Sequence, residues 1–363
     1  MKITPIKPTG ITLIATLRCS AACDNCCFGC NPAQGRSMTY DQMQSYVDMS
    51  LEAYPDSINR FSLTGGECML LKKDVGRILS YCSGKGLECF MVSNAYWATD
   101  YEKARKILRH LQRCGLNSVA FSTGEDHDKY VPWTNVRNAV AAAAHLGLSP
   151  ELRYEDRPGR TAILQCLEAD EQVGPLIKTH HIRVSKSSWM NFNNNGPKSR
   201  VWKIPFREHE GMGGCKSLFQ DVIINPYGEV YACCGIGVCR IPQMRIGNVN
   251  REPIKAIYEH AFEDFLKIWL YMEGPNAVLK YVHEKTGQKK FNWHTSHNCD
   301  ICRAIFTDGE IIPCIRENFY DAAYFPMMTY NSVAEKENEE RSKRKETPHP
   351  YANHKQIPKG RVR

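Results

Sequence analysis

The sequence predicts an α/β protein in which a parallel sheet with crossover helices precedes a smaller unit built on a β-hairpin. Residues 11–186 alternate apolar runs of strand length with stretches whose apolar residues recur at helical spacing. That alternation is typical of parallel strands joined by helices. Residues 225–228 (NPYG) later separate two alternating runs, as in a hairpin. The length of 363 residues accommodates one large domain and one small one.

Six strands are expected in the first region, with helices between them. Their ranges are 11–17, 59–63, 88–93, 117–122, 148–153 and 180–185. The first helix begins near Thr39, because Thr39 and Gln42 have the spacing of a capping box and the residues that follow are apolar at helical intervals. Another helix is expected at 139–146. Residues that directly follow the strands are expected to share one site.

A cysteine-rich loop, residues 18–30 (RCSAACDNCCFGC), follows the first expected strand. Thiolates at Cys19, Cys23 and Cys26 can bind three corners of a cubic iron–sulfur cluster, which leaves one iron without a protein ligand. Cys27 and Cys30 supply two further sulfurs that compete for these places. A zinc knuckle and structural thiols are the alternatives.

The loop spacing CxxxCxxC, together with residues 64–67 (TGGE) after the second strand, resembles the radical SAM superfamily. The resemblance implies a partial (β/α)6 radical SAM barrel that is open on one side. It also implies a [4Fe-4S] cluster whose vacant iron is chelated by S-adenosylmethionine (SAM). The expected activity is cleavage of SAM to a 5′-deoxyadenosyl radical, which abstracts a hydrogen atom from a substrate C–H bond.

The resemblance also implies a set of SAM-binding residues at the strand ends. These are Phe28, Gly65, Gly66, Glu67, Asn94, Ser122 and Arg153. The glycine segment is expected to hold the SAM amino group, Asn94 its ribose, and Ser122 and Arg153 its carboxylate. Phe28 is expected near the adenine, because Asn25 stands where the family commonly has an aromatic residue. An arginine in a strand expected to be buried also needs an anion as partner.

A second cysteine set lies in the C-terminal part. Cys215 and Cys233 flank the hairpin in the pattern CX12GX4C, and Cys299 and Cys302 follow in a CxxC pair. This resembles the twitch domain, the shorter relative of the SPASM domain, and implies an auxiliary [4Fe-4S] cluster bound by all four thiolates. The longer CX2CX5CX3C array of a full SPASM domain is absent, and a zinc site with the same ligands is the alternative.

The expected organisation has four segments. They are an N-terminal segment (1–10), the radical SAM partial barrel (11–205), the twitch/SPASM-like domain (206–332) and a basic, disordered tail (333–363). About +7 of the net charge of +8 lies in residues 341–363, so the body is nearly neutral and nucleic acid is not an expected partner. No apolar segment of membrane or signal length begins the chain, so seventeen cysteines indicate a reducing cytoplasm and no membrane.

The expected reaction is modification of a ribosomally synthesised peptide, with L-to-D epimerisation favoured. Cys234 directly follows Cys233, and radical SAM peptide epimerases carry such a vicinal pair, whose second thiol returns hydrogen to the Cα radical. The alternatives are peptide cross-linking through a thioether or C–C bond, alcohol dehydrogenation of a small molecule, and a non-enzymatic electron carrier. The expected partners are a peptide substrate and a flavodoxin- or ferredoxin-type electron donor. Cys239, Cys314 and residues 266–297 receive no role.

Overall fold

The computed structural model describes residues 3–33, 35–156, 159, 161–188, 213–287 and 297–344. The chain forms two compact units. The first, called the barrel unit, contains Leu13–Ser45 and Asn59–Trp189. The second, called the C-terminal unit, contains Met1–Thr12, Tyr46–Ile58 and Met190–Glu346. Among the described residues, no helix is long and apolar enough to cross a membrane.

The barrel unit is organised around an open parallel sheet. Its strands are β1 (Gly10–Thr16), β2 (Arg60–Gly65), β3 (Glu88–Ser93), β4 (Leu116–Thr123), β5 (Ser149–Asp156) and β6 (Arg183–Ser188). They follow the order β6-β5-β4-β3-β2-β1, and every pair from β2 to β6 is parallel. Strands β1 and β6 are not neighbours in this order, so the sheet does not close. The expected partial (β/α)6 barrel is therefore confirmed.

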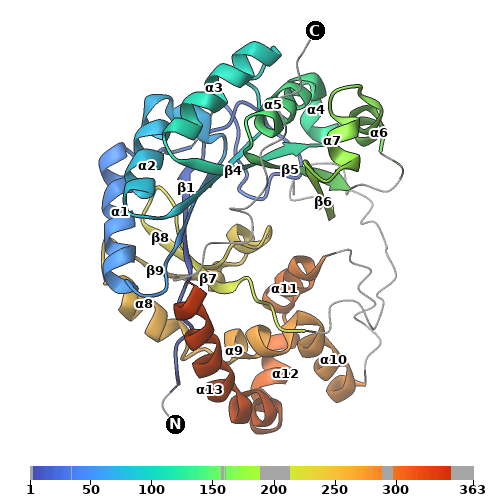
Figure 1. The fold of residues 1–363 in the computed structure, drawn as a ribbon. Coiled ribbons are helices and arrows are strands. Elements are labelled where there is room, and N and C mark those ends of the chain that lie inside the picture. The colour runs from blue at the N-terminus through green and yellow to red at the C-terminus, as the bar shows by residue number, and fades with distance from the viewer. Residues whose placement is uncertain are drawn as a thin grey trace. The chain divides into compact units, whose positions relative to one another are not determined.

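The strands of this sheet are connected by helices. They are α1 (Tyr40–Ala53), α2 (Lys73–Gly84), α3 (Tyr101–Arg113), α4 (Glu125–Asp128), α5 (Trp133–His145), α6 (Ala162–Ala169) and α7 (Gly174–Lys178). Figure 1 shows α2, α3 and α5 along the same side of the strands. Along strand β3, buried residues alternate with half-buried ones, so one face of the strand is more deeply buried than the other. The half-buried residues of β3 share the other face, which remains partly accessible.

Local sequence signals place most of these elements correctly. In the predicted capping box, Thr39 N–H donates to Gln42 Oε1 (3.1 Å) and Gln42 N–H donates to Thr39 Oγ1 (3.2 Å). The sixth strand is the least accurate prediction, because it begins at Arg183 and not at residue 180. Residues 179–182 complete the turn that ends α7, in which His180 has a φ of 59°.

The C-terminal unit begins with the predicted hairpin and continues in helices. Strands β7 (Leu218–Ile224), β8 (Glu229–Cys233) and β9 (Arg245–Asn248) pair antiparallel. The short helices η2 (Val238–Arg240) and η3 (Pro242–Met244) precede β9. The longer helices are α8 (Ile254–Ala261), α9 (Phe265–Met272), α10 (Gly274–Thr286), α11 (Asn298–Thr307), α12 (Ile311–Glu317) and α13 (Phe319–Arg344). Buried aromatic rings join the hairpin to these helices, with the ring centres of Phe219 and Phe262 4.0 Å apart.

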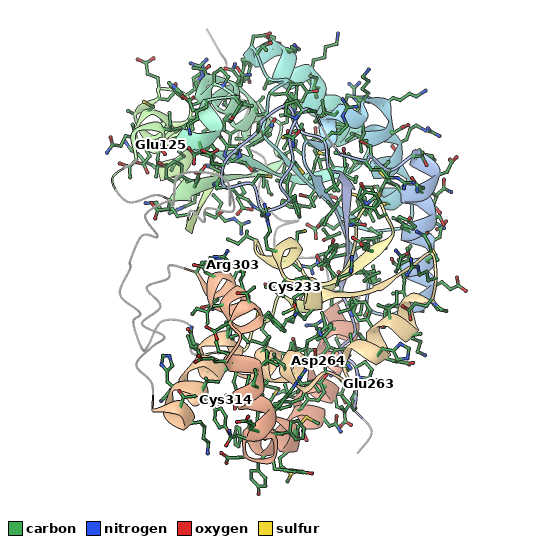
Figure 2. The ribbon with its side chains drawn as sticks, turned by 180° about the vertical axis from the view of Figure 1, so that it is seen from behind. Glu125, Cys233, Glu263, Asp264, Arg303 and Cys314 are labelled. Carbon is green, nitrogen blue, oxygen red and sulfur yellow. The ribbon has the colours of Figure 1, made fainter. Side chains whose placement is uncertain are left out.

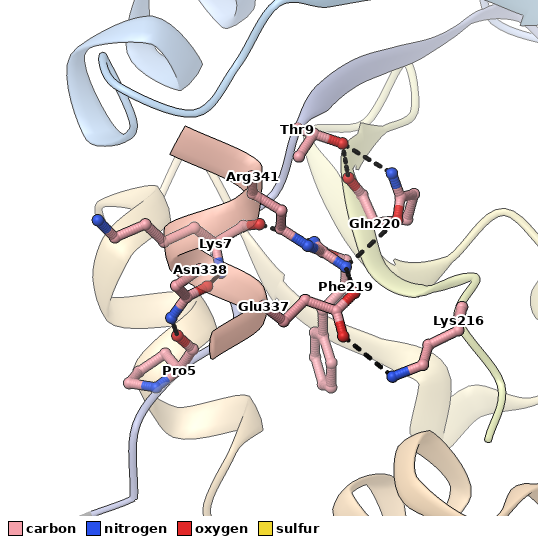
Figure 3. Close-up of polar contacts among 9 residues, drawn as sticks. All are labelled: Pro5, Lys7, Thr9, Lys216, Phe219, Gln220, Glu337, Asn338 and Arg341. Atoms are coloured by element: carbon pink, nitrogen blue, oxygen red, sulfur yellow. Dashed lines mark hydrogen bonds and ion pairs between the residues drawn. The ribbon is translucent and has the colours of Figure 1, made fainter. Parts of the chain in front are cut away.

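The disordered tail was expected to begin at residue 333, which is too early. Residues 333–344 continue helix α13 and are not disordered, while 345–363 lie outside the described residues. The physical reason is a buried arginine, Arg341, whose guanidinium donates to the carbonyl oxygens of Lys7 (2.7 Å) and Phe219 (3.3 Å). Asn338 adds a reciprocal pair of contacts to the N-terminal segment, at Lys7 N–H and Pro5 O. Figure 3 shows these contacts around the last turns of α13.

One carboxylate completes this network. Glu337 accepts from Arg341 (3.1 Å) and from Lys216 (3.0 Å), which precedes β7. Burial alone would raise the pKa of Glu337, but the interactions with Tyr271, Lys216 and Arg341 outweigh it and lower the pKa to about 2. The ionised form of Glu337 therefore stabilises the packing of α13.

Replacing Glu337→Gln should lower the free energy of unfolding at pH 7 by at most about 3 kcal/mol. Because the folded pKa lies below the ordinary value of 4.5, the carboxylate contributes fully above pH 4.5 and loses its effect as the pH falls toward 2. The difference between wild type and variant should therefore shrink across that window. Urea unfolding at pH 7, 4 and 3 measures it. Glu102→Gln, at an exposed pair on α3, is the matched control and should change little.

Candidate functional site

The cysteine loop leaves the end of β1 and is held by backbone hydrogen bonds within the barrel unit. Leu17 N–H donates to Arg36 O (2.9 Å), and Cys19 N–H donates to Asn31 O (3.2 Å). Burial raises the pKa of Cys19 to about 11 and that of Cys23 to about 12, and the other cysteines of the loop add to both shifts. The structure therefore brings the thiols of Cys19, Cys23 and Cys26 together. Phe28 lies half-buried two residues beyond them.

Cys26 has a different environment from its two neighbours. A hydrogen bond from the Cys30 thiol and backbone N–H groups of Phe28, Gly29 and Cys30 lower the pKa of Cys26 to about 6. The Cys30 N–H group donates to Cys26 Sγ, with 3.2 Å between nitrogen and sulfur. Donors aimed at sulfur stabilise the thiolate, which is the form that binds metal. Cys30 itself is buried and acts as a donor to Cys26.

The glycine segment after β2 fits against the start of the cysteine loop. Gly66 N–H donates to Thr16 O (2.7 Å), and Glu67 N–H donates to Arg18 O (2.9 Å). A Cβ on Gly66 would lie 2.0 Å from Arg18 O, and one on Gly65, where φ is +139°, would lie 2.3 Å from Thr16 O. Only glycine permits this approach. The contact of these glycines with a ligand stays a prediction, and in this structure they hold the start of the cysteine loop.

Glu67 links the ends of β2 and β3. Its fully buried carboxylate accepts from the backbone N–H of Asn94 (2.7 Å) and from the hydroxyl of Ser93 (2.9 Å). Burial raises the pKa of Glu67 to about 7, and these hydrogen bonds oppose the rise. The Asn94 amide in turn donates to Cys19 Sγ (3.6 Å) and Ser20 Oγ (3.0 Å). Asn94 therefore lies directly beside the cysteine loop.

Ser122 and Arg153 are register partners on β4 and β5. The expectation that Arg153 is buried is wrong, because its side chain is 43% exposed and lies 3.5 Å from the Glu151 carboxylate. Side chains alternate along a strand. Leu152 and Tyr154, the neighbours on either side, are buried on the opposite face, so Arg153 lies on the face that also carries Glu151 and Glu155. Its expected role at the SAM carboxylate stays a prediction.

A group of charged side chains lies after β4 and at the carboxyl end of β5, and one of them contacts the cysteine loop. Lys129 lies 2.6 Å from the buried Asp126 and 3.7 Å from Asp24, which is a loop residue. His127 Nδ1 lies 3.3 Å from Glu155. Burial raises the pKa of Glu155 more than its hydrogen bond with His127 lowers it. Sequence reasoning missed Glu155, since its relation to His127 depends on the register of neighbouring strands.

In the C-terminal unit, the four predicted thiols lie together. A Cβ on Gly235 would be 2.9 Å from Cys299 Sγ and 3.4 Å from Cys233 Sγ. Burial raises the pKa of Cys299 and Cys302, and the neighbouring Cys215 adds to both shifts. Figure 2 shows Cys233 in the same region of this unit as α11, the helix that carries both Cys299 and Cys302.

Backbone donors also surround these sulfurs. Burial raises the pKa of Cys233 and of Cys299, and nearby backbone N–H groups oppose the rise, Gly235 at Cys233 and Gly237 and Ile236 at Cys299. His297 Nδ1 accepts from Cys299 N–H (3.1 Å) and so caps α11. Two glycines shortly after a cysteine are the signal that could have indicated these donors. The adjacent Cys234 is exposed.

The donor sets fit iron–sulfur clusters by their chemistry. Sulfur is the soft ligand that such clusters select, and N–H donors to sulfur are a usual part of their surroundings. In the described part of the chain, no group of three or more His, Cys, Asp or Glu side chains is placed to hold a single metal ion. No disulfide joins the seventeen cysteines, all of which are described.

Gly66→Ala should destabilise the barrel unit by about 1–3 kcal/mol, because the new methyl group overlaps the Arg18 carbonyl. It should also reduce the iron that the N-terminal cysteine set retains. Gly84→Ala is the matched control, because nothing lies within 4 Å of its Cβ position at the end of α2. Thermal unfolding and iron content per chain measure both effects. Equal results for the two variants would contradict the proposed packing.

Comparison with known proteins agrees with this geometry. Residues 215–278 match the SPASM family, an iron–sulfur cluster-binding domain. The chain is 20% identical over 300 residues to the "Putative peptide biosynthesis protein YydG" of Bacillus subtilis (strain 168), covering 81% of this chain and 91% of that protein. The solved structure of native anSMEcpe with bound AdoMet superposes with a TM-score of 0.53 at 14% identity, covering 91% of this chain and 100% of the other. The chain therefore has the radical SAM fold, followed by a SPASM-type domain.

Proposed function

We propose that this protein is a radical SAM enzyme that epimerises a residue of a ribosomally synthesised peptide from the L to the D form. The observation that carries the proposal is that each unit, taken by itself, gathers one cysteine set, with backbone N–H groups near Cys26, Cys233 and Cys299. When bound, a [4Fe-4S] cluster with SAM supplies a 5′-deoxyadenosyl radical, which removes a hydrogen atom from a substrate C–H bond.

The protein's own residues bind and orient the reactants. We assign the first cluster to Cys19, Cys23 and Cys26, and the auxiliary cluster to Cys215, Cys233, Cys299 and Cys302. Phe28, Gly65, Gly66, Glu67, Asn94 and Ser122 would line the SAM site. Supporting this assignment, Asn94 and the glycine segment both contact the cysteine loop. Arg153 remains the predicted partner of the SAM carboxylate, with its side chain partly exposed and 3.5 Å from Glu151.

The peptide substrate and the epimerisation are the finer parts of the proposal. The relative's name supports a role in peptide biosynthesis. Cys234 is exposed and adjacent to the proposed cluster ligand Cys233. In the proposed step the Cα–H bond breaks, and the Cys234 S–H bond then delivers its hydrogen to the opposite face of the carbon radical. The sulfur radical regains one electron and one proton.

The surroundings of the enzyme follow from this chemistry. We propose a flavodoxin- or ferredoxin-type donor as the source of the electrons. A reducing compartment such as the cytoplasm would keep the seventeen thiols available to bind iron.

Anaerobically reconstituted protein should hold about eight irons, as two clusters of four, and the triple variant Cys19/Cys23/Cys26→Ala should retain about half. The triple variant should also lose reductive cleavage of SAM. Iron analysis and quantification of 5′-deoxyadenosine measure these results. Zinc in the wild type, with no loss of iron in the triple variant, would contradict the assignment of two clusters.

Cys234→Ala should still cleave SAM but form no D-residue, because the substrate radical has no hydrogen donor. In deuterated water, the wild-type product should gain one deuterium from the exchangeable thiol. Mass spectrometry and chiral amino-acid analysis of the product peptide measure both.

Cys233→Ala provides the comparison, since it should lose auxiliary-cluster iron while Cys234→Ala keeps it. A wild-type product two mass units lighter than the substrate, without solvent deuterium, would exclude epimerisation. That result would support cross-linking or alcohol dehydrogenation, with the auxiliary cluster as electron acceptor.

A further inference from the structure

Helix α9 packs against the first ligand of the proposed auxiliary cluster. The backbone N–H of Cys215 donates to the carbonyl oxygen of Leu270 in the last turn of α9 (2.9 Å). The preceding residue comes equally close, because a Cβ on Gly214 would lie 1.9 Å from Tyr271 O. Lys267 is three residues before Leu270 on the same helix, which is about 5 Å along the helix axis. The backbone of Cys215 is thus fixed about one helical turn from Lys267.

Lys267 is a buried cation whose carboxylate partner is much more exposed. The Lys267 side chain is 7% exposed, and its ammonium group pairs with the Asp264 carboxylate. Asp264 caps α9, because its other oxygen accepts from the backbone N–H of Leu266 (3.0 Å). The Asp264 side chain is 39% exposed, so water screens its charge more than that of Lys267. A buried ammonium group is costly unless anions lie near it.

A second cysteine of the set lies near the same ammonium group. Burial raises the pKa of Cys302, the neighbouring Cys299 and Cys215 add to the rise, and Lys267 opposes it. Cys302 belongs to α11, whereas Cys215 precedes β7. Lys267 is therefore near two of the four thiols, and these two come from different elements of the C-terminal unit.

The charge of an iron–sulfur cluster changes when an electron is added. Four thiolate ligands make the site anionic, and the added electron makes it more so. A fixed positive charge nearby stabilises the reduced form more than the oxidised form, and the effect is stronger in the protein interior than in water. The charge and hydrogen bonding around a cluster are among the properties that set its reduction potential.

We propose that the buried ammonium group of Lys267, held by Asp264, raises the reduction potential of the auxiliary cluster. This inference rests on the proposed function, because it takes Cys215, Cys233, Cys299 and Cys302 to bind that cluster. Lys267 acts through the cluster and is a positioning residue, since it favours the location of an electron in the C-terminal unit. It makes the auxiliary cluster the better electron acceptor of the two that each chain would hold.

The experiment uses the full-length, anaerobically reconstituted Cys19/Cys23/Cys26→Ala variant, so that only the auxiliary cluster is titrated. Adding Lys267→Met should lower the ratio of reduced to oxidised cluster at a fixed potential about tenfold, which is a shift of about 59 mV for one electron. Lys267→Arg should keep most of the original potential, because the positive charge remains. Redox titration followed by electron paramagnetic resonance of the reduced cluster measures the shift.

Lys216→Met is the matched control. Lys216 directly follows Cys215 in the chain, but its side chain is 54% exposed and lies 3.0 Å from Glu337. Its removal should therefore shift the potential less than Lys267→Met does. An unchanged potential in Lys267→Met, or an equal or larger shift in Lys216→Met, would overturn the inference. So would a Lys267→Arg protein whose potential falls as far as that of Lys267→Met.

Asp264→Asn tests the same charge in the opposite direction and decides the matter if Lys267→Met fails to bind iron. Asparagine can still cap α9, while the charge of Lys267 loses its partner. The potential should therefore rise, and an unchanged or lower value would contradict the role of Lys267. Absence of a four-iron cluster from the triple variant would instead contradict the proposed function, so the two failures are distinguishable.

Discussion

The backbone contact between the glycine segment and the cysteine loop is the constraint on which the rest of the barrel site depends. Gly66 and Glu67 donate to carbonyl oxygens that flank the start of the loop, and side chains larger than hydrogen would prevent this approach. The Glu67 carboxylate then fixes the end of β3, and through Asn94 reaches the sulfur of Cys19. Three segments that are distant in sequence are thus aligned by one short turn.

Both cysteine sets use the same local solution to hold negative charge in a buried place. Peptide N–H groups that closely follow a cysteine lower the pKa of a nearby thiol against the effect of burial, at Cys26 in the barrel unit and at Cys233 and Cys299 in the C-terminal unit. Such donors offset part of the cost of desolvating a thiolate. In iron–sulfur proteins they also influence the reduction potential. The backbone therefore contributes to the electronic properties of both proposed clusters.

Features that depend on residues close together in the sequence could be predicted, whereas features that depend on contacts between distant residues could not. Local patterns predicted the capping box at Thr39 and the hairpin, and the structure contains both at the predicted positions. Strand β6 is polar and shows no apolar alternation. Its predicted range therefore began three residues before the strand in the structure. The exposure of Arg153 depends on which face of β5 is covered, a question of strand phase that composition does not answer. The end of α13 is polar on all sides, and its partners Lys216, Phe219 and Lys7 are 121, 122 and 334 residues away in sequence.

The distance in sequence between α13 and its partners also affects the order in which the chain can assemble during synthesis. The N-terminal segment meets α13 through hydrogen bonds such as the one between Lys7 O and Arg341, which are 334 residues apart. At a translation rate of 5–20 residues per second, roughly 20–70 s pass between the appearance of the two partners. Contacts of such sequence separation also form slowly because long loops must close. The nascent N-terminal segment thus lacks its contacts with α13 until more than 330 further residues have been synthesised, so α13 docks late relative to the elements that precede it.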